Sequence, residues 1–213
     1  MALMNRNPWL TIWTKPQETI RAIVTLNPNF RIIALAAIYG FPFLMHLAQN
    51  LSLGLQFPMW GIILGSAVLS PVVGIIGFTI ISSLLYMTGR WIKGSATFAQ
   101  VRAAVAWSNV PNSVNIILWL VLSAFFGNLL FLRDFAQGEF IGRDLTVVLS
   151  VFTAQVVLGI WSFIILLRSL GEVQKFSVWK SLLNIILPSV LVFILVWVVM
   201  WAIWAFSGMP QGV

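Results

Sequence analysis

Two polar side chains, His46 and Gln155, lie within long apolar segments of the sequence. A histidine can titrate near neutral pH and gate the passage of a solute, and a glutamine surrounded by lipid tails needs a hydrogen-bond partner. Each residue also has a simpler interpretation as a packing residue that is hydrogen-bonded to a neighbouring helix. The two residues therefore support two hypotheses, a path for a small solute or lipid, and a set of interhelical hydrogen bonds.

The sequence offers few other groups for chemistry. It has one histidine and no cysteine, which excludes the usual multi-histidine and thiolate metal sites. The segment from Gly89 to Ser95 has two glycines at the spacing of a nucleotide-binding loop but lacks the lysine of such a loop. Asp134, Glu139 and Asp144 share their loop with Arg133 and Arg143, which favours a solvated, salt-bridged loop over a weak cation site. We expect no enzyme activity, no metal and no cofactor.

The composition shows which solvent surrounds these residues. Of the 213 residues, 60% are hydrophobic and only 8% are charged, and the mean hydropathy is +0.99. Soluble domains are roughly 45–50% apolar and about 25% charged. The chain has too few charges to cover a surface that faces water, and we therefore predict an integral membrane protein.

Uncharged runs in the sequence define the membrane-spanning segments. A helix crosses the hydrocarbon core of a bilayer with about 20 apolar residues. Runs of this length predict an all-α, five-helix bundle with spans at about 32–50, 59–88, 113–132, 145–167 and 181–206. The segment 1–31 precedes this membrane domain, and a short tail, 207–213, follows it.

The basic residues predict the orientation, because loops rich in lysine and arginine stay in the cytoplasm. Ten of the twelve lie in the segments that alternate with the outer loops: Arg6, Lys15, Arg21, Arg31, Arg90, Lys93, Arg102, Arg168, Lys175 and Lys180. The N-terminus is therefore expected in the cytoplasm and the C-terminus outside. These charges are spread over three short segments, which favours attraction to anionic lipids over nucleic-acid binding.

Two of the cytoplasmic segments predict short amphipathic helices that lie in the plane of the membrane. One ends at Asn27, and the other covers about residues 95–109. We expect the cytoplasmic surface to contact lipid and a partner protein through aromatic and basic side chains, namely Trp9, Trp13, Arg21, Arg102, Trp107, Trp179 and Lys180.

The second span carries small residues at four-residue spacing. Such residues let helix backbones approach closely in lipid. We therefore expect helix packing or an oligomer contact through Gly61, Gly65, Ser66, Ser70 and Gly74.

Several motifs in this order resemble the Yip domain family, the Ypt/Rab-interacting membrane proteins. They are Lys15-Pro-Gln-Glu18 near the first tryptophans, Ala106-Trp107-Ser-Asn-Val-Pro111 before the third span, and Glu172-Val-Gln-Lys-Phe-Ser-Val-Trp-Lys180 before the fifth. The resemblance covers nearly the whole chain and implies a cytoplasmic N-terminus and five spans. Eukaryotic members of the family are linked to Rab GTPases, to one another as hetero-oligomers, and to vesicle traffic.

This sequence departs from the eukaryotic pattern at its N-terminus. Only about 31 residues precede the first span, and the acidic Asp-Leu-(Tyr/Trp)-Gly-Pro motif is missing, so the resemblance does not extend to Rab binding. The short form resembles the prokaryotic branch, which implies a bacterial inner membrane, or the endoplasmic reticulum or Golgi if the source is eukaryotic.

These features predict a membrane adaptor or scaffold that binds lipid and a partner protein or a second copy of itself. The alternative is a small-solute transporter or a lipid-translocating protein with a path along His46 and Gln155.

Overall fold

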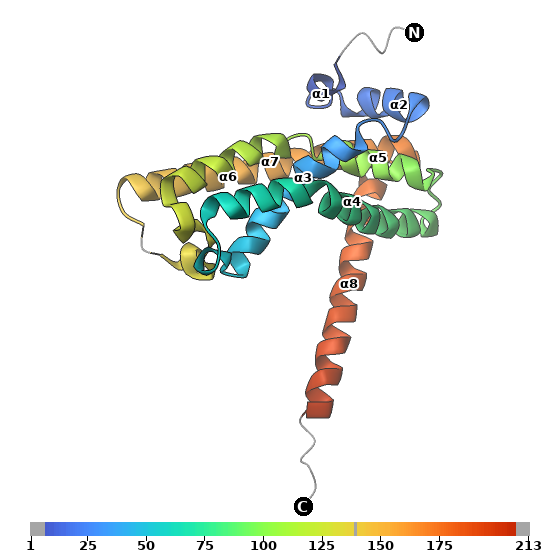
Figure 1. Ribbon diagram of the computed structural model, residues 1–213. Helices are drawn as coiled ribbons and strands as arrows, with labels where there is room; N and C mark the ends of the chain where they lie inside the picture. Colours follow the sequence, from blue (N-terminus) through green and yellow to red (C-terminus); the bar gives the residue numbers. More distant parts are fainter. Residues whose placement is uncertain (1–6, 139, 208–213) are drawn as a thin grey trace, which may run out of the picture.

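The computed structural model describes residues 7–138 and 140–207, and every regular element in these ranges is a helix (Figure 1). The elements are α1 (Pro8–Thr11), α2 (Pro16–Leu26), α3 (Ile32–Asn50), η2 (Leu53–Leu55), α4 (Met59–Trp91), α5 (Phe98–Ser108), α6 (Asn112–Phe126), η3 (Gly127–Phe131), η4 (Arg133–Gln137), α7 (Arg143–Gln174) and α8 (Val178–Ser207).

Five of these helices are long and apolar enough to cross a membrane. They are α3, α4, α6 with η3, α7, and α8 over Val178–Ala205, which confirms the predicted number of spans. At 33 and 32 residues, α4 and α7 exceed the roughly 20 residues that a bilayer requires. The last turns of α4 and of α7 belong to the candidate functional site.

Helices α3 and α4 pack closely because small residues meet at their contact. Ser66, Ser70 and Gly74 are buried on α4, and a Cβ atom added to Gly74 would overlap the backbone oxygen of Ala36 on α3. Gly40 on α3 approaches the backbone of Ser70 in the same way. Without side chains at these two glycines, the backbones themselves are in contact, as small-residue packing in lipid requires.

Two of the five small residues predicted to pack lie away from this contact. A Cβ atom on Gly61 would meet only Pro58, at the start of the same helix, and one on Gly65 would meet nothing within 4 Å. The buried face of α4 runs through Ile62, Ser66 and Ser70. Since Gly61 and Gly65 lie off this face, they pack against no other helix of the described chain.

The segment predicted as a second in-plane helix is instead an interior helix. A capping box between Thr97 and Gln100 starts α5, and Val101 and all residues from 103 to 108 are buried. Helices α2, α4 and α7 all contact it. Its alanines let these neighbours approach from several sides, so protein covers the faces that an interfacial helix would expose.

The expected five-helix bundle is a bundle of four. Helices α3, α4, α6 and α7 run along a shared direction, whereas α8 crosses them and extends away from the bundle (Figure 1). The start of α8 contacts α4 and α7, but every residue from 189 to 201 is exposed. Hydropathy identifies α8 as an apolar helix, but it does not specify which neighbours the helix packs against.

Candidate functional site

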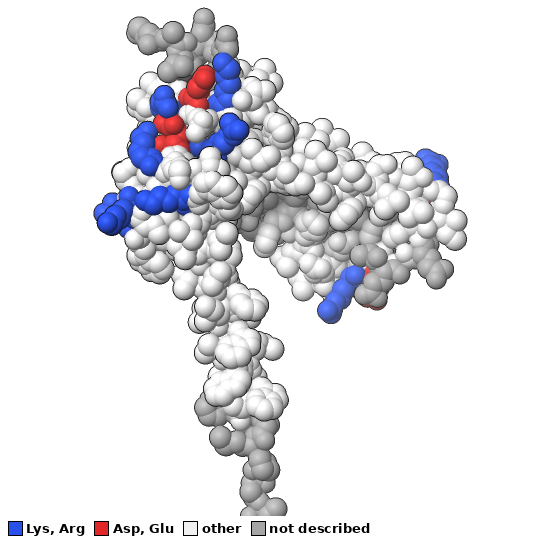
Figure 2. Space-filling model, turned by 180° about the vertical axis from the view of Figure 1, so that it is seen from behind, with Lys and Arg blue, Asp and Glu red and all other residues white. Residues whose placement is uncertain are grey.

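The charged side chains gather mainly at the end of the molecule that carries α1 and α2 (Figure 2). We call this region the basic end and define it as residues 7–31, 89–111 and 168–182. It contains α1, α2 and α5, the last turns of α4 and α7, and the first turns of α8. All seven residues predicted to contact lipid or a partner belong to the basic end.

Aromatic side chains form the core of the basic end. Trp107 on α5 is fully buried. Its ring centroid lies 5.4 Å from that of Trp9 and 6.1 Å from that of Phe30, with which it stacks. Trp9 and Trp13 are partly buried against the same cluster. The expectation that Trp107 contacts lipid or a partner is therefore corrected, because its ring is enclosed by the protein.

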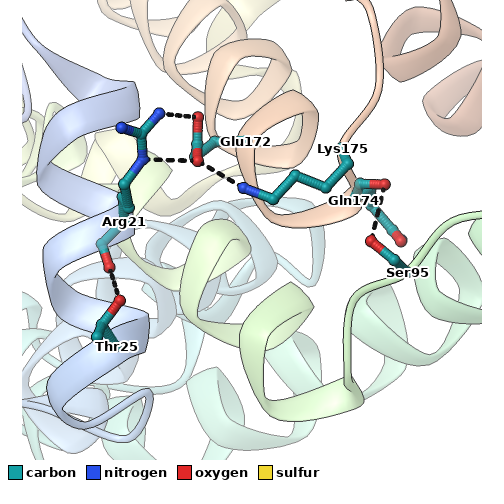
Figure 3. Close-up of polar contacts among 6 residues, drawn as sticks. All are labelled: Arg21, Thr25, Ser95, Glu172, Gln174 and Lys175. Atoms are coloured by element: carbon teal, nitrogen blue, oxygen red, sulfur yellow. Dashed lines mark hydrogen bonds and ion pairs between the residues drawn. The ribbon is translucent and has the colours of Figure 1, made fainter.

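An ion pair joins α2 to the end of α7 (Figure 3). Arg21 donates from Nε and Nη2 to the two carboxylate oxygens of Glu172, at 2.8 and 2.9 Å. Lys175 Nζ donates to the same carboxylate at 2.9 Å. The Glu172 side chain is 10% exposed and that of Arg21 is 61% exposed. The hydrogen bond and the negative charge of Glu172 raise the pKa of Arg21, which keeps the guanidinium charged.

The predicted contact residue Arg102 is also engaged within the protein. Its Nη2 atom donates to Asn29 Oδ1 at 2.7 Å, and its guanidinium lies 5.5 Å from the centre of the Phe98 ring. Both Arg21 and Arg102 thus hold the N-terminal segment onto α5 and α7. The structure gives them an internal role that the sequence analysis did not anticipate.

Buried amides connect the end of α7 to the loop after α4, and the last turns of α4 to α8. The backbone N–H of Ala96 donates to Gln174 Oε1 at 3.2 Å. The Ser95 hydroxyl donates to the Gln174 backbone oxygen at 3.4 Å (Figure 3). Thr88 Oγ1 donates to Asn184 Oδ1 at 2.8 Å. The sequence analysis missed Gln174 and Glu172 as anchoring residues. The only local signal was an acidic residue within a basic segment.

Besides the ion-paired Arg21, two predicted contact residues are exposed at the surface. Trp179 is 79% exposed, and Lys180 is exposed with its Nζ atom 5.1 Å from the centre of the Phe176 ring. Both lie in the first turn of α8. Of the seven residues, these two are the ones best placed to meet a lipid or a partner directly.

The two residues of the predicted path both lie against α6. Gln155 Nε2 on α7 donates to Asn115 Oδ1 at 2.9 Å, which is the interhelical hydrogen bond of the simpler hypothesis. His46 on α3 lies edge-on to Trp119, with ring centroids 4.7 Å apart. The structure thus pairs each residue separately with α6.

A depression of about 480 Å³ lies at the opposite end of the bundle, where Asp134 and Asp144 are among its lining residues. Glu139, the third carboxylate of the predicted salt-bridged loop, lies outside the described residues. Within the described ranges, no three histidine, aspartate or glutamate side chains are grouped so as to hold a metal ion.

One of three comparisons with known proteins identifies the family of the chain. Neither the curated proteins nor the solved structures contain a match to the chain. A family model, described as the Yip1 domain, matches residues 10–200. The match covers the spans α3 to α7, most of α8, and nearly all of the basic end, and the chain therefore belongs to the Yip1 domain family of integral membrane proteins.

Proposed function

We propose that this protein is a membrane adaptor or scaffold that binds lipid and a partner protein through the basic end. The Yip1 family is not an enzyme family, so association is the function to be explained. One observation carries the proposal: large apolar side chains are exposed in the basic end, which also carries nine of the twelve lysine and arginine residues of the chain. Leu10, Leu26 and Trp179 are 71%, 62% and 79% exposed.

The internal contacts of the basic end support this proposal. Arg21, Arg102 and Trp107 fix α2 and α5 in place, so the exposed residues are presented on a firmly packed support. Preorganised surfaces lose less conformational entropy when they bind. Clusters of exposed apolar residues with polar neighbours are typical of interaction sites.

The proposed setting is a bacterial inner membrane, with the basic end in the cytoplasm and the C-terminus outside. This orientation rests on the unequal distribution of lysine and arginine between the two ends. The proposed ligands are anionic lipids together with a partner protein or a second copy of the chain. Neither a nucleic acid nor a Rab-type GTPase is part of the proposal.

The transport alternative gains no support from the described residues. Gln155, the central polar residue of the suggested path, is paired with Asn115. His46 contacts the buried ring of Trp119. Both contacts serve helix packing, so the adaptor function remains our conclusion.

Photo-crosslinking in the native membrane tests the adaptor proposal. A photoreactive amino acid replaces Leu10, Leu26 or Trp179 in three separate variants, and the adducts are identified by mass spectrometry. Leu55 in η2, which is 76% exposed at the other end of the bundle, is the matched control. We expect one protein to recur at the three basic-end positions and to be missing at Leu55. Adducts with lipid alone at all four positions would overturn the partner-binding part of the proposal.

A further inference from the structure

The crossing of α4 and α8 brings two basic and aromatic segments together. Thr88 on α4 contacts Asn184 on α8 through a 2.8 Å hydrogen bond. Just beyond Thr88, Arg90 and Trp91 end α4, and Lys93 follows in the next loop. One helical turn before Asn184, the start of α8 carries Trp179 and Lys180. All five of these side chains are exposed. We call them the crossing rim.

The backbone beneath the crossing rim is held firmly. Lys93 has a left-handed conformation with φ of 66°, and the N–H of Gly94 donates to the Gly89 oxygen at 2.7 Å. The next two residues, Ser95 and Ala96, bond to Gln174. These hydrogen bonds hold the loop after α4 against the end of α7. They therefore fix the backbone from which the Lys93 side chain extends.

Two cations at the crossing have no partner among the described residues. Arg90 and Lys93 have no ion pair or hydrogen bond from their side chains to the described residues. Behind them, Gln174 and Asn184 are 1% and 0% exposed, and their amino groups have no acceptor within the described chain. The Gln174 carbonyl oxygen accepts from the backbone N–H of Ala96, so rotating this amide would sacrifice an existing bond. Asn184 Oδ1 lies 2.8 Å from Thr88 Oγ1, which also lies 2.9 Å from the Leu84 backbone oxygen.

The Gln174 and Asn184 amides both lie beside Gly89. A Cβ atom added to Gly89 would overlap Gln174 Nε2 and would lie 3.4 Å from Asn184 Nδ2. Glu172, the acidic residue of this part of α7, is occupied by Arg21 and Lys175. Cations and amide donors with no competing carboxylate form an environment that favours an anion.

Two tryptophans indicate the source of that anion. Trp91 is 61% exposed and Trp179 is 79% exposed, and each stands at the end of a helix that is apolar enough to enter a bilayer. Tryptophan at such positions lies at the level of the lipid headgroups, where anionic lipids attract nearby lysine and arginine. The two exposed indole rings would contribute nothing to the binding of a soluble phosphate ester.

We propose that the crossing rim binds the phosphate group of an anionic phospholipid, with Arg90, Lys93 and Lys180 as the cations that contact it. This rests on the proposed lipid binding of the basic end and assigns it to a defined site. Trp91 and Trp179 lie against the acyl-chain boundary, and Gln174 and Asn184 place the loop and α8 beneath the phosphate.

Native mass spectrometry of the full chain in neutral detergent tests this assignment. The protein is titrated with phosphatidylglycerol and, separately, with phosphatidylcholine. One variant combines Arg90→Gln, Lys93→Gln and Lys180→Gln. The matched control combines Lys15→Gln, Arg31→Gln and Arg168→Gln, which removes three other exposed charges from the same end. Circular dichroism verifies that both variants remain folded.

We expect the wild type to prefer phosphatidylglycerol and the rim variant to bind it roughly 100-fold more weakly, since each basic residue near an anionic surface contributes appreciably. The control variant should stay within about threefold of the wild type, because screened, distant charges act weakly. Equal losses in both variants would overturn the proposal by reducing it to general charge attraction. Equal binding of the two lipids would overturn it as well.

A competition experiment separates the two sources of phosphate. Glycerol 3-phosphate at millimolar concentration should not displace phosphatidylglycerol. Displacement would overturn the lipid assignment in favour of a soluble phosphate ester. The crosslinking at Leu10 and Leu26 does not depend on the crossing rim, so a failure of this proposal is distinguishable from a failure of the adaptor proposal.

Discussion

At the scale of single residues, the role of a side chain at the basic end depends on the partner it finds. Arg21 resembles any surface arginine in the sequence, but it forms a two-pronged hydrogen bond with Glu172. Paired planar donors and acceptors of this kind are stronger than single contacts. The ion pair joins residues 151 positions apart, so it fastens the N-terminal helix to the membrane domain.

A double-mutant cycle with Arg21→Gln and Glu172→Gln measures this ion pair. Because the Arg21 side chain is well exposed, we expect a small, favourable coupling free energy between the two residues, read from unfolding in detergent. A second cycle with Lys15→Gln and Glu18→Gln is the control, since this exposed 3.7 Å pair should show almost no coupling. A coupling for Arg21 and Glu172 no larger than that of the control pair would contradict the anchoring role.

At the scale of elements, the contact of α3 with α4 shows how small residues act in pairs. Gly40 lies against the backbone of Ser70, and Gly74 lies against that of Ala36. Each helix therefore places a glycine against the other helix, and the two contacts together fix the register of the pair. A helix in lipid gains its stability from such packing, because lipid tails provide no hydrophobic drive for helices to associate.

The substitution Gly74→Ala should destabilise the protein by roughly 1–3 kcal/mol, the usual cost of inserting a methyl group into a packed contact. The change is measured as the free energy of unfolding in detergent micelles. Gly65→Ala is the matched control, because its new methyl group meets nothing within 4 Å and alanine favours helix by about 0.5–1 kcal/mol. Equal destabilisation by both substitutions would show that Gly65 also packs, for example in an oligomer.

At the scale of the whole molecule, the buried residues of α8 among those described all lie in its first three turns. Its first turns are held by Thr88 on α4 and by contacts with α7. Beyond these turns it extends from the bundle (Figure 1), and its residues from 189 to 201 are exposed. The four-helix bundle with the basic end is therefore expected to be stable without the distal part of α8.

Deleting residues 191–213 tests this expectation. The unfolding midpoint of the shortened protein in detergent should change by less than about 4 °C, which corresponds to roughly 1 kcal/mol for a chain of this size. A second deletion that starts at residue 177 removes the buried Ser181 and Asn184 as well and should lower the midpoint clearly. A large effect of the shorter deletion would mean that distal α8 packs against the bundle.

The sequence by itself determined the properties that depend on local composition. Long uncharged runs predict five apolar helices, because crossing a bilayer requires length and hydrophobicity within one segment. The same argument predicts the helical class, in agreement with the five apolar helices. The order of short motifs indicates the Yip family, and the family match over residues 10–200 confirms this assignment. Small residues at four-residue spacing also identified Ser66, Ser70 and Gly74, which are buried.

Only the tertiary structure decided which faces those helices use. Spacing alone cannot distinguish the buried Gly74 from the exposed Gly65, because both belong to small-residue series on the same helix. The clustering of aromatic and basic residues in the cytoplasmic segments predicted Trp107 as a surface residue, whereas α5 is enclosed by α2, α4 and α7. The pairing of Arg21 with Glu172 and the departure of α8 from the bundle also depend on contacts between distant segments. Such contacts arise from the packing of whole elements, which no local pattern of residues encodes.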